Sequence, residues 1–541
     1  MLSVIGFLVI LAPLVIVHEF GHFFFAKLFG VKAEAFSVGF GPRIWSRQIG
    51  ETEFRVSIVP LGGYVKLLGE DAETQLSEEE KKRALHHQAR WKRFWIYFGG
   101  PLFNFLFAII IYMTILVVGE PQMASVIGRV EQGSPAYQAG FRSGDKVLEI
   151  GGKPVQFFTD MMVTINEAPE QPLSFKVVHQ DSNQPEVMTI MTTTEPGFSI
   201  YGEAKRVGRI EGIYSNPRAT RLGISSPQSL AAKASLKTWE EITEFNGRPV
   251  PNWEALELMY QQAAAGPFTL KVKSDDTKSR DVALSKPKPS VSLAQDLGLH
   301  SSELFVEKTV KNSPAEKAGL QKGDRIFSVG GSDLRSFFHM KDRIQADGEA
   351  KGEVQVVWER GGEKISKLIH PTATAERDPI LRKTTTFTIG LMPMLALTES
   401  VMIKHRILNP ITLFVEATSR MLVLSWRNLV SIAKMFVGEV SVGTLGGPIL
   451  IGKIAGDSLS RGLIAFLSTM AVLSVGLGIL NVLPVPVLDG GHIMLLLVET
   501  LRRKRLTMRQ MEIFQQVGLS LILILMLVVM KNDVMRLPFF N

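Results

Sequence analysis

Two histidines and one glutamate stand close together near the start of the chain, in the pentad His18-Glu19-Phe20-Gly21-His22. On a helix, residues four positions apart project from one face, so both imidazoles can bind the same Zn²⁺. The glutamate is rotated by one residue and lies near the metal without having to bind it. It can therefore act as the general base that takes a proton from water. The pentad predicts a zinc site in which Glu19 is the catalytic residue.

The surroundings of the pentad strengthen this interpretation. The pattern also occurs by chance in soluble proteins, but here it lies at the end of an apolar run over residues 2–26. Ionisable groups inside a bilayer cost about 2.5–3.5 kcal/mol each and are retained mainly for function. The alternative, a polar cluster that only helps helices to pack, is disfavoured because a second polar cluster follows another apolar run.

That second cluster is the segment NVLPVPVLDGG at 481–491. Pro484 and Pro486 interrupt any continuous helix here. Non-helical backbone at membrane depth is tolerated only where protein or a water-filled cavity satisfies its polar groups, so the break is expected to line a site. Asp489 is the only carboxylate between residues 462 and 497. It can supply the third ligand of a catalytic zinc and leave the fourth position to water.

Apolar runs in the sequence predict a membrane protein. The 541 residues are 46% hydrophobic, although 21% are charged. Each of the runs 2–26, 94–118, 462–480 and 514–530 approaches the roughly 20 residues that cross a bilayer as a helix. The first run lacks a basic leader and a cleavage site, so we expect it to be retained. The fold class is therefore a polytopic α-helical membrane protein with four transmembrane helices.

Basic residues predict the orientation of these helices, because Lys and Arg gather on the cytoplasmic side of a membrane. They flank the first connection and crowd the last: Lys27, Lys32, Arg90, Lys92, Arg93, Arg502, Arg503, Lys504, Arg505 and Arg509. Four crossings then place both termini and the long middle segment, roughly 119–460, on the opposite side of the membrane, and the pentad opens toward the cytoplasm. The net charge of +8 is largely this signal, and no basic patch is interleaved with aromatics, so we expect no nucleic-acid partner. The chain contains no cysteine, which excludes disulfides and Cys-bound metal.

The middle segment contains an internal repeat. The stretch SPAYQAGFRSGDKVLEIGG at 134–152 recurs as SPAEKAGLQKGDRIFSVGG at 313–331. A third copy lies 95 residues after the first, and in it Ser235 and Trp239 replace the two motif glycines. The repeats resemble PDZ domains, small α+β modules with an AGL, GDxI and glycine-turn signature. We therefore predict three inserted PDZ-like modules at 122–205, 206–290 and 291–395, of which the second is degenerate.

PDZ domains bind an extended peptide or a free C-terminus by adding a strand to a sheet edge. Peptide C-termini are therefore expected partners of these modules. The alternative is that the modules are spacers that filter access to the membrane, and this alternative is strongest for the second module. The remaining regions are an N-terminal membrane half at 1–118, a linker with a membrane-associated helix at 396–461, and a C-terminal membrane half at 462–541. Within the first half, residues 36–66 predict a β-hairpin beside the membrane.

Taken together, the motifs resemble the site-2 protease family of intramembrane metalloproteases, peptidase family M50. The matching segments are HEFGH, GFGP, PLGGYVKLLGE, GGPLFNF at 99–105 and NVLPVPVLDGGH at 481–492. They cover both ends of the chain. Relatives with PDZ domains commonly carry two, whereas three are predicted here.

The resemblance implies roles for residues at the matching positions. His18, His22 and Asp489 would bind Zn²⁺, and Glu19 would activate water. Asn481, together with Pro484 and Pro486 of the broken helix, would bind substrate. Asn104 would contact substrate or be structural, and His492 would position a ligand or be structural.

The resemblance also implies an activity, a location and partners. The activity would be site-2 cleavage of single-pass membrane proteins in regulated intramembrane proteolysis, by a zinc metalloendopeptidase of the bacterial inner membrane. Substrates would be transmembrane proteins of the anti-sigma-factor type or remnant signal peptides, within membrane lipid. A silent PDZ scaffold and a zinc carrier are the alternative classes. Because a helix hides its amides, we expect an unwound substrate to add as a strand to the 36–66 hairpin.

Overall fold

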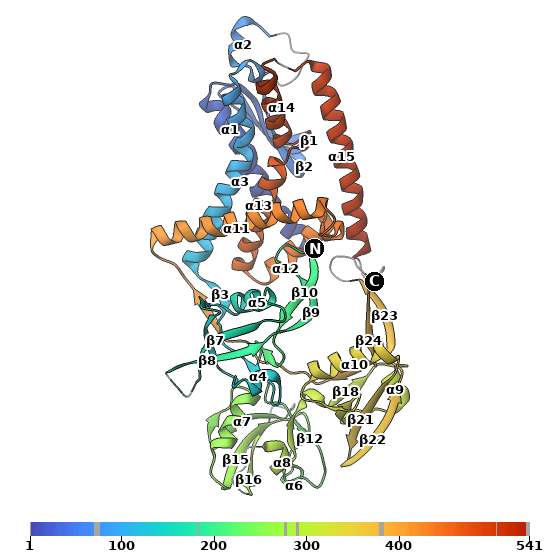
Figure 1. Ribbon diagram of the computed structural model, residues 1–541. Helices are drawn as coiled ribbons and strands as arrows, with labels where there is room; N and C mark the ends of the chain where they lie inside the picture. Colours follow the sequence, from blue (N-terminus) through green and yellow to red (C-terminus); the bar gives the residue numbers. More distant parts are fainter. Residues whose placement is uncertain are drawn as a thin grey trace.

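A helical bundle forms one end of the molecule and three β-rich modules form the other (Figure 1). The computed structural model describes residues 2–69, 76–180, 182, 184–274, 278–287, 292–377, 383–504 and 506–536. Both ends of the chain contribute helices to the bundle, whereas the modules come from the middle of the sequence (Figure 1). This arrangement brings the two predicted polar clusters into the same bundle.

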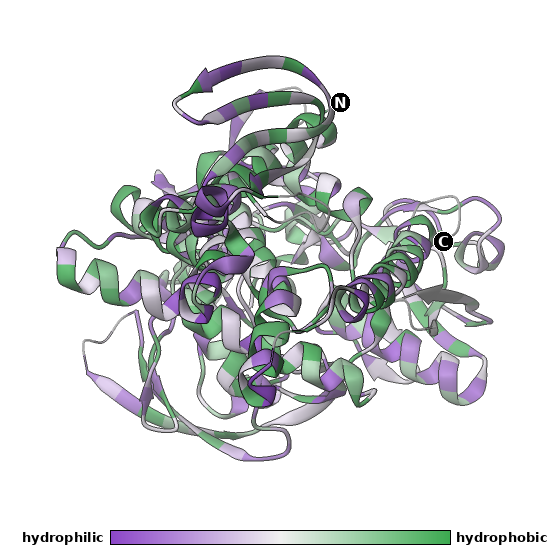
Figure 2. Ribbon diagram, turned by 90° about the horizontal axis from the view of Figure 1, so that it is seen from above, coloured by the Kyte–Doolittle hydropathy of each residue, from purple (hydrophilic) through white to green (hydrophobic). Residues whose placement is uncertain are grey.

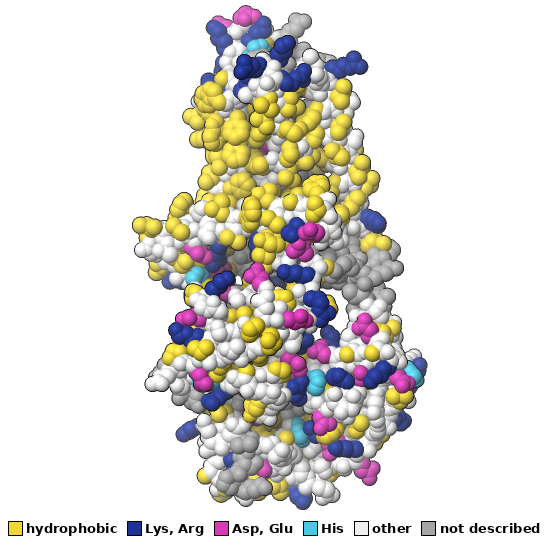
Figure 3. Space-filling view, in the orientation of Figure 1, with side chains coloured by type: hydrophobic (Ala, Val, Ile, Leu, Met, Phe, Trp, Pro, Cys, Tyr) yellow, Lys and Arg dark blue, Asp and Glu magenta, His cyan; other side chains and the backbone are white. Residues whose placement is uncertain are grey.

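Four helices in the described part of the chain are long and apolar enough to cross a membrane. They are α1 (Leu2–Leu28), α3 (Arg90–Val118), α13 (Leu463–Val482) and α15 (Met508–Met535). These agree with the four predicted spans. Apolar side chains form a broad band over the bundle, and charged side chains gather above it (Figure 3). The length and composition of the helices make this a membrane protein.

The bundle has a tight centre and a loosely attached helix. Side chains from α1, α3 and α13 form a shared core that includes the almost fully buried Ile10, Ile115 and Val475. By contrast, only 6% of the apolar window of α15 is buried. Seen from above, the helix beside the C-terminus is largely hydrophobic around its circumference and lies apart from the central group (Figure 2).

Two long, bent strands, β1 (Ala33–Ile49) and β2 (Thr52–Leu67), form a small sheet against α1. Residues 33–38 pair on one side with 63–67 and on the other with 53–56, while 52–57 also pair with 43–49. We call this the 33–67 sheet. Its inner segments are 33–38 and 52–57, and its two edges are 43–49 and 63–67. Gly39 and Gly41 take φ values of +93° and +86°, which suits the sharp bend ahead of Pro42.

The three modules share one sheet topology. Their four-stranded sheets have the orders β6-β5-β7-β8, β14-β13-β15-β16 and β20-β19-β21-β22. The first module consists of β4 (Arg129–Val130), α4 (Pro135–Gln138), β5 (Lys146–Ile150), β6 (Lys153–Pro154), α5 (Phe158–Asn166), β7 (Pro172–Val178), β8 (Pro185–Met191), β9 (Thr193–Phe198), β10 (Ala204–Arg209) and β11 (Ile213–Tyr214).

The second and third modules follow the same plan. The second contains β12 (Leu222–Ile224), α6 (Leu230–Lys233), β13 (Glu241–Phe245), β14 (Arg248–Pro249), α7 (Trp253–Gln262), β15 (Gly266–Lys273), β16 (Ser279–Lys286), α8 (Leu293–Leu297) and β17 (Leu299–Ser301). The third contains β18 (Val306–Thr309), α9 (Pro314–Ala318), β19 (Arg325–Val329), β20 (Ser332–Asp333), α10 (Phe337–Lys351), β21 (Val354–Arg360), β22 (Glu363–Ile369), β23 (Thr372–Arg377), β24 (Lys383–Thr388) and β25 (Leu391–Pro393). Each module has its own hydrophobic core.

The repeated motif has a local structural cause. In each copy a serine caps a short helix: the Oγ atoms of Ser134, Ser229 and Ser313 accept a backbone N–H three residues later, at 3.1, 3.2 and 3.3 Å. In the first and third copies, proline follows at the first helical position, where its missing N–H costs nothing. The Ser-Pro dipeptide therefore marks the start of a helix.

Strand pairing crosses two of the predicted module boundaries. The boundary at 205/206 falls inside β10, and β11 pairs with β4 of the first module. Similarly, β17 pairs with β12, so residues 299–301 belong with the second module rather than the third. We propose boundaries near residues 215 and 304. The sequence repeat alone could not locate them, because each module is completed by a strand that lies outside the repeated motif.

The remaining elements connect modules and bundle. The strand β3 (Glu120–Met123), directly after α3, pairs with β26 (Met402–His405), directly before α11 (Pro410–Phe436). The chain therefore leaves the bundle and returns to it at one place. The other elements are α2 (Glu78–Arg83), α12 (Pro448–Ser460), α14 (Asp489–Arg502) and the short 3₁₀ turns η1 (Leu85–His87), η2 (Ser302–Leu304) and η3 (Val442–Thr444).

Candidate metal centre

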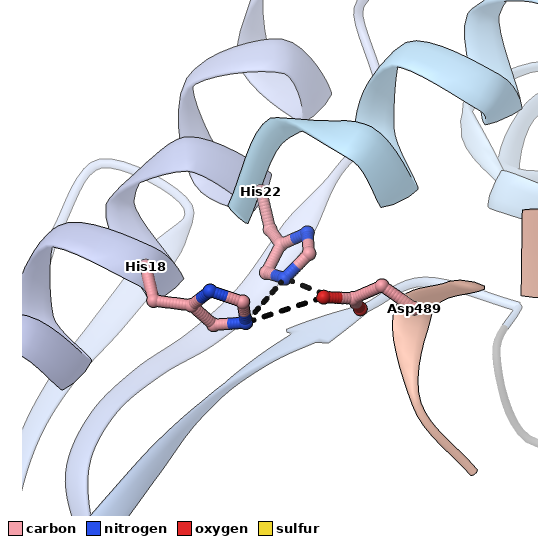
Figure 4. A group of neighbouring side chains, drawn as sticks. All are labelled: His18, His22 and Asp489. Carbon is pink, nitrogen blue, oxygen red and sulfur yellow. Dashed lines mark hydrogen bonds and ion pairs between the residues drawn. The ribbon is translucent and has the colours of Figure 1, made fainter. Parts of the chain in front are cut away.

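The three predicted metal ligands meet inside the bundle. His18 and His22 project from one face of α1, and Asp489 approaches them from the first residue of α14 (Figure 4). The two Nε2 atoms lie 3.3 Å apart. Asp489 Oδ2 lies 3.3 Å from His18 Nε2, and Oδ1 lies 3.4 Å from His22 Nε2. Within the described residues, this is the one group of three or more His, Asp or Glu side chains with such spacing.

These distances fit a zinc ion. Ligand atoms on a tetrahedron around zinc, each about 2.0–2.1 Å from the metal, lie roughly 3.3–3.4 Å from one another. The two Nε2 atoms show this spacing, and each lies 3.3–3.4 Å from one of the two Asp489 oxygens. With one ligand atom taken from each residue, the three atoms lie within 4.8 Å of one another. Asp489 Oδ2 is also buried without a hydrogen-bond partner, which would be costly for a carboxylate oxygen that had no cation to bind. Three protein ligands leave a fourth position for water or substrate.

His22 is held in the tautomer that a metal requires. Its Nδ1 lies 2.8 Å from the backbone oxygen of Ile96 in α3, to which it donates its proton. The lone pair of Nε2 is then free to face the metal. A hydrogen bond of this kind fixes the orientation of a metal-binding imidazole and raises its basicity.

Asn104 lies on the opposite side of the His18 ring. It is fully buried, and its side-chain amide lies 3.1 Å from His18 Nδ1. The atom placed there is Nδ2, whereas Oδ1 has no partner. A zinc-bound His18 carries its proton on Nδ1, and the amide turned over about its axis would place Oδ1 there as the matching acceptor. Burial behind His18 removes Asn104 from the reach of substrate. Of the two roles implied by the resemblance, this position favours the structural one.

Asn481 stands beside the metal site at the end of α13. Its Nδ2 lies 3.3 Å from His18 Nε2, and its side chain is only partly buried. The amide can therefore reach a substrate placed over the histidines. Of the two prolines expected to contact substrate, Pro484 is exposed, whereas Pro486 is buried and lies against Gly518 of α15.

The proline-containing break is what brings Asp489 to the histidines. The chain bends after α13, and Val487 takes a φ of +78°, an unfavourable value for a β-branched residue. A Cβ on Gly490 would lie 2.2 Å from the Leu483 oxygen, and one on Gly491 would lie 2.4 Å from the Val485 oxygen. The two glycines therefore let α14 start against the bend, with Asp489 in its first turn, where the helix dipole favours a carboxylate.

Glycines also bring α1 and α3 together at the site. A Cβ on Gly21 would lie 2.1 Å from the Gly99 oxygen, and one on Gly100 would lie 2.4 Å from His22 Nε2. Sequence analysis recorded these residues only within the HEFGH and GGPLFNF motifs and assigned them no role. The glycines in the two motifs were the signal in the sequence that could have predicted a close approach of these two helices. His492, also without a firm role, stacks on Tyr97 with the ring centroids 4.8 Å apart.

Glu19 contacts β2 while staying close to the ligand cluster. Its Cγ lies beside Gly63, the backbone N–H of Val65 hydrogen-bonds its carboxylate, and it interacts electrostatically with His18, His22 and Asp489. The predicted catalytic glutamate therefore lies between the histidines and the 63–67 edge of the 33–67 sheet. A peptide lying along this edge would pass both Glu19 and the ligand cluster.

Comparison with known proteins agrees with this geometry. A family model described as Peptidase family M50 matches residues 6–525. The chain belongs to peptidase family M50. It is 30% identical over 537 residues to a regulator of sigma E protease of Haemophilus influenzae, with 98% of each chain covered. It is 27% identical over 547 residues to the regulator of sigma-E protease RseP of Salmonella typhimurium, again with 98% of each covered.

Further relatives extend the comparison. A Vibrio cholerae protein whose name contains the words zinc metalloprotease is 29% identical over 538 residues, with 98% of both chains covered. A PDZ domain from Listeria monocytogenes matches 18% of this chain and 90% of its own length, at 19% identity and a TM-score of 0.14. The family and the full-length relatives make this chain an intramembrane zinc metalloprotease.

Proposed function

We propose that this protein performs site-2 cleavage, hydrolysing a peptide bond within the transmembrane segment of a single-pass membrane protein. The observation that carries this proposal is a cluster of three metal-binding side chains next to Glu19, inside a bundle of apolar helices. The two histidine Nε2 atoms are 3.3 Å apart, and each lies 3.3–3.4 Å from one oxygen of Asp489. Zinc bound there would supply Lewis-acid chemistry, which acidifies a water molecule and polarises a peptide carbonyl.

The chain's own residues then have distinct tasks. Glu19 accepts the proton of the attacking water and passes it to the leaving amine as the C–N bond breaks. Asn481 donates a hydrogen bond to the substrate backbone beside His18. Asn104 and the Ile96 carbonyl hold the two imidazoles in position. Substrate must be unwound at this point, because a helix keeps its own carbonyls hydrogen-bonded.

We further propose that the protein lies in a bacterial inner membrane with the metal centre open to the cytoplasm. Supporting this, Arg90, Lys92 and Arg93 begin α3, and Arg502 and Arg503 end α14. The start of α3 and the end of α14, with these basic residues, lie at the end of the bundle opposite the modules (Figures 1 and 3). By the positive-inside rule that end is cytoplasmic, so the PDZ-like modules are periplasmic.

The proposed substrates are transmembrane proteins of the anti-sigma-factor type and remnant signal peptides. Two relatives are named as regulators of sigma E protease, which connects the family to transcriptional stress control. The test is a trapping experiment: the Glu19→Gln variant is expected to keep its fold and zinc while losing nearly all turnover. Membrane proteins that accumulate with it, and not with a Glu79→Gln control on exposed α2, are the substrates. Cleavage by the Glu19→Gln variant would contradict the general-base assignment.

The unwound substrate binds, in this proposal, as an added strand on the 63–67 edge. The sequence predicted strand addition to the 36–66 hairpin as a whole, without choosing an edge. In the structure Val56 pairs with both Val38 and Trp45, so it is already enclosed within the sheet. The 63–67 edge is the one beside Glu19, whereas 43–49 lies at the other edge. Extended peptides bind to proteins by adding as a strand to the edge of a sheet.

The absence of cysteine allows a direct test of this edge. A Tyr64→Cys variant on the 63–67 edge should form a disulfide with a cysteine placed at the scissile region of a trapped substrate. A Trp45→Cys variant on the 43–49 edge is the matched control and should not. Equal cross-linking of both variants would rule out addition at a single edge.

For the modules, we propose that they restrict access rather than take part in catalysis. The Ala124 N–H donates to the Val401 oxygen at 2.9 Å, so residues 124–401 can be replaced by a short linker without pulling the bundle apart. Cleavage of substrates with short periplasmic domains should then stay the same or increase. Loss of that cleavage would indicate that the modules recruit substrate, for instance through its C-terminus.

A further inference from the structure

A large open cavity lies at the highly charged end of the bundle, away from the metal centre. It has a volume of about 970 Å³ and is bounded by the η1 turn, the first turn of α3 and the outer half of α14. No motif and no part of the proposed mechanism uses it. Its lining is divided into a basic part and an apolar part.

The basic part contains His87, Arg90 and Arg93. Glu499 is the one acidic residue of the lining, and it is fully engaged: Oε2 accepts from Arg93 Nη1 at 3.1 Å and Oε1 accepts from the Leu506 N–H at 3.3 Å. Arg93 is only 6% exposed, and its Nε has no hydrogen-bond partner. Arg90 has no ion-pair partner in the part of the chain that the structure describes. The cavity therefore carries uncompensated positive charge.

The start of α3 adds to this charge. The capping residue is Ala89, which offers no side-chain oxygen to the first-turn N–H groups. The positive end of the helix dipole therefore coincides with Arg90, an unfavourable combination that a bound anion would relieve. A separate observation concerns Arg93, which lines the same cavity: its guanidinium is buried, and Glu499 satisfies Nη1 while Nε has no hydrogen-bond partner.

The apolar part is formed by Trp91, Phe94 and Leu497, which are 57%, 36% and 58% exposed. Trp91 and Phe94 belong to the first turns of α3, one of the helices long and apolar enough to cross a membrane. A free phosphate would fill only the basic part and leave the apolar part exposed to water. A molecule with an anionic head and an apolar tail matches both parts, and the surrounding bilayer supplies such molecules.

We propose that this cavity binds one anionic phospholipid, with its phosphate between Arg90 and the start of α3 and an acyl chain along Phe94 and Leu497. The lipid would join α3 to α14, which carry the Ile96 carbonyl and Asp489 of the metal centre. It would thereby brace the two helices that orient His22 and supply the third ligand. The enzyme should consequently work faster in membranes that contain anionic lipid.

The first test measures lipid retention by native mass spectrometry of the full chain released from nanodiscs. Wild type should retain one phosphatidylglycerol and should not retain phosphatidylcholine. Arg90→Gln should lower this retention about tenfold, as expected for loss of a charge-assisted hydrogen bond. Arg502→Gln removes the same charge from an exposed site outside the cavity lining and should leave retention unchanged. Equal losses in both variants would show general charge attraction and overturn the proposal.

A second variant tests the apolar part without altering charge. Leu497→Trp should fill the space for the acyl chain and also lower phosphatidylglycerol retention. Inorganic phosphate should not displace the lipid, and displacement at millimolar concentration would overturn the lipid assignment. Retention is measured without any cleavage, so these outcomes are independent of whether the protease proposal holds. In nanodiscs, replacement of phosphatidylglycerol by phosphatidylcholine should slow wild-type cleavage and have little effect on Arg90→Gln.

Discussion

Glycines at the metal centre and glycines in the modules meet different requirements. At the centre, Gly100 lies where any Cβ would contact the histidine rings, at 2.4 Å from His22 Nε2 and 2.6 Å from His18 Cε1. In the first module, Gly140 has open surroundings, the nearest atom to a Cβ being 3.6 Å away, but its φ is +98°. The first glycine is required by space, and the second by backbone conformation.

The degenerate second module shows how tolerant the conformational requirement is. Ser235 and Trp239 stand where the other copies have glycine, yet they keep left-handed φ values of +65° and +84°. The Trp239 ring packs 6.4 Å from that of Phe305, next to the third module. A left-handed backbone conformation costs a non-glycine residue about 1–2 kcal/mol. The hydrophobic core of the module can compensate for this loss of stability. A clash with a metal ligand cannot be absorbed in the same way, because the histidines cannot move without losing their geometry.

The largest expected effect comes from Gly100→Ala. The added methyl group should push His18 and His22 apart, lower zinc content and reduce cleavage about a hundredfold or more, since a shift of about 1 Å has that effect on catalysis. Zinc content and the cleavage rate of a test transmembrane substrate measure it. Gly476→Ala in α13, where nothing lies within 4 Å of the new methyl, is the control. Full activity of Gly100→Ala would remove the steric argument.

A smaller effect is expected at Asn104. Asn104→Ala removes the contact with His18 Nδ1, so zinc affinity and turnover should fall about tenfold. Asn104→Asp keeps an acceptor for the Nδ1 proton and should bind zinc more tightly than the alanine variant. The control is Ser474→Ala, which deletes a buried hydroxyl that donates to the backbone oxygen of Asn104. It shows the effect of losing a buried polar group that does not contact a histidine. Zinc titration is the readout, and equal affinity in both alanine variants would leave Asn104 with no positioning role.

The smallest effect is expected in the modules. Ser235→Gly relieves the left-handed strain and should stabilise the second module by about 0.5–1 kcal/mol, while Gly140→Ser should destabilise the first by about 1–2 kcal/mol. Hydrogen exchange of the module strands in the full-length protein measures both changes. Cleavage should not change in either variant. Opposite signs would show that side-chain contacts, and not backbone conformation, set the residue choice at these positions.

Much of this organisation was predictable because it is local. The four spans follow from apolar runs of membrane length, and the proximity of His18 to His22 follows from helical spacing. The Ser-Pro start of the repeats follows from helix capping. The predicted module boundaries at 205/206 and 290/291 separate strands that pair with each other, β11 with β4 and β17 with β12, because these completing strands lie outside the repeated motif. The sequence could not predict which segment of the 33–67 sheet forms the edge beside Glu19. The bends of β1 and β2 let each strand pair with more than one segment of the other.

The sequence by itself determined which residues could form the metal centre. Two histidines at helical spacing and one carboxylate after a broken apolar helix are local patterns, set by residue type and position. Only the tertiary structure decided that Asp489 meets the histidines at 3.3–3.4 Å, and that Asn104 stands behind His18 rather than facing substrate. These contacts join residues far apart in the sequence, and they depend on how closely α1, α3 and α14 approach. Contacts of Gly21 with Gly99, and of Gly100 with both histidines, set the approach of α1 to α3, and no single stretch of sequence contains both partners.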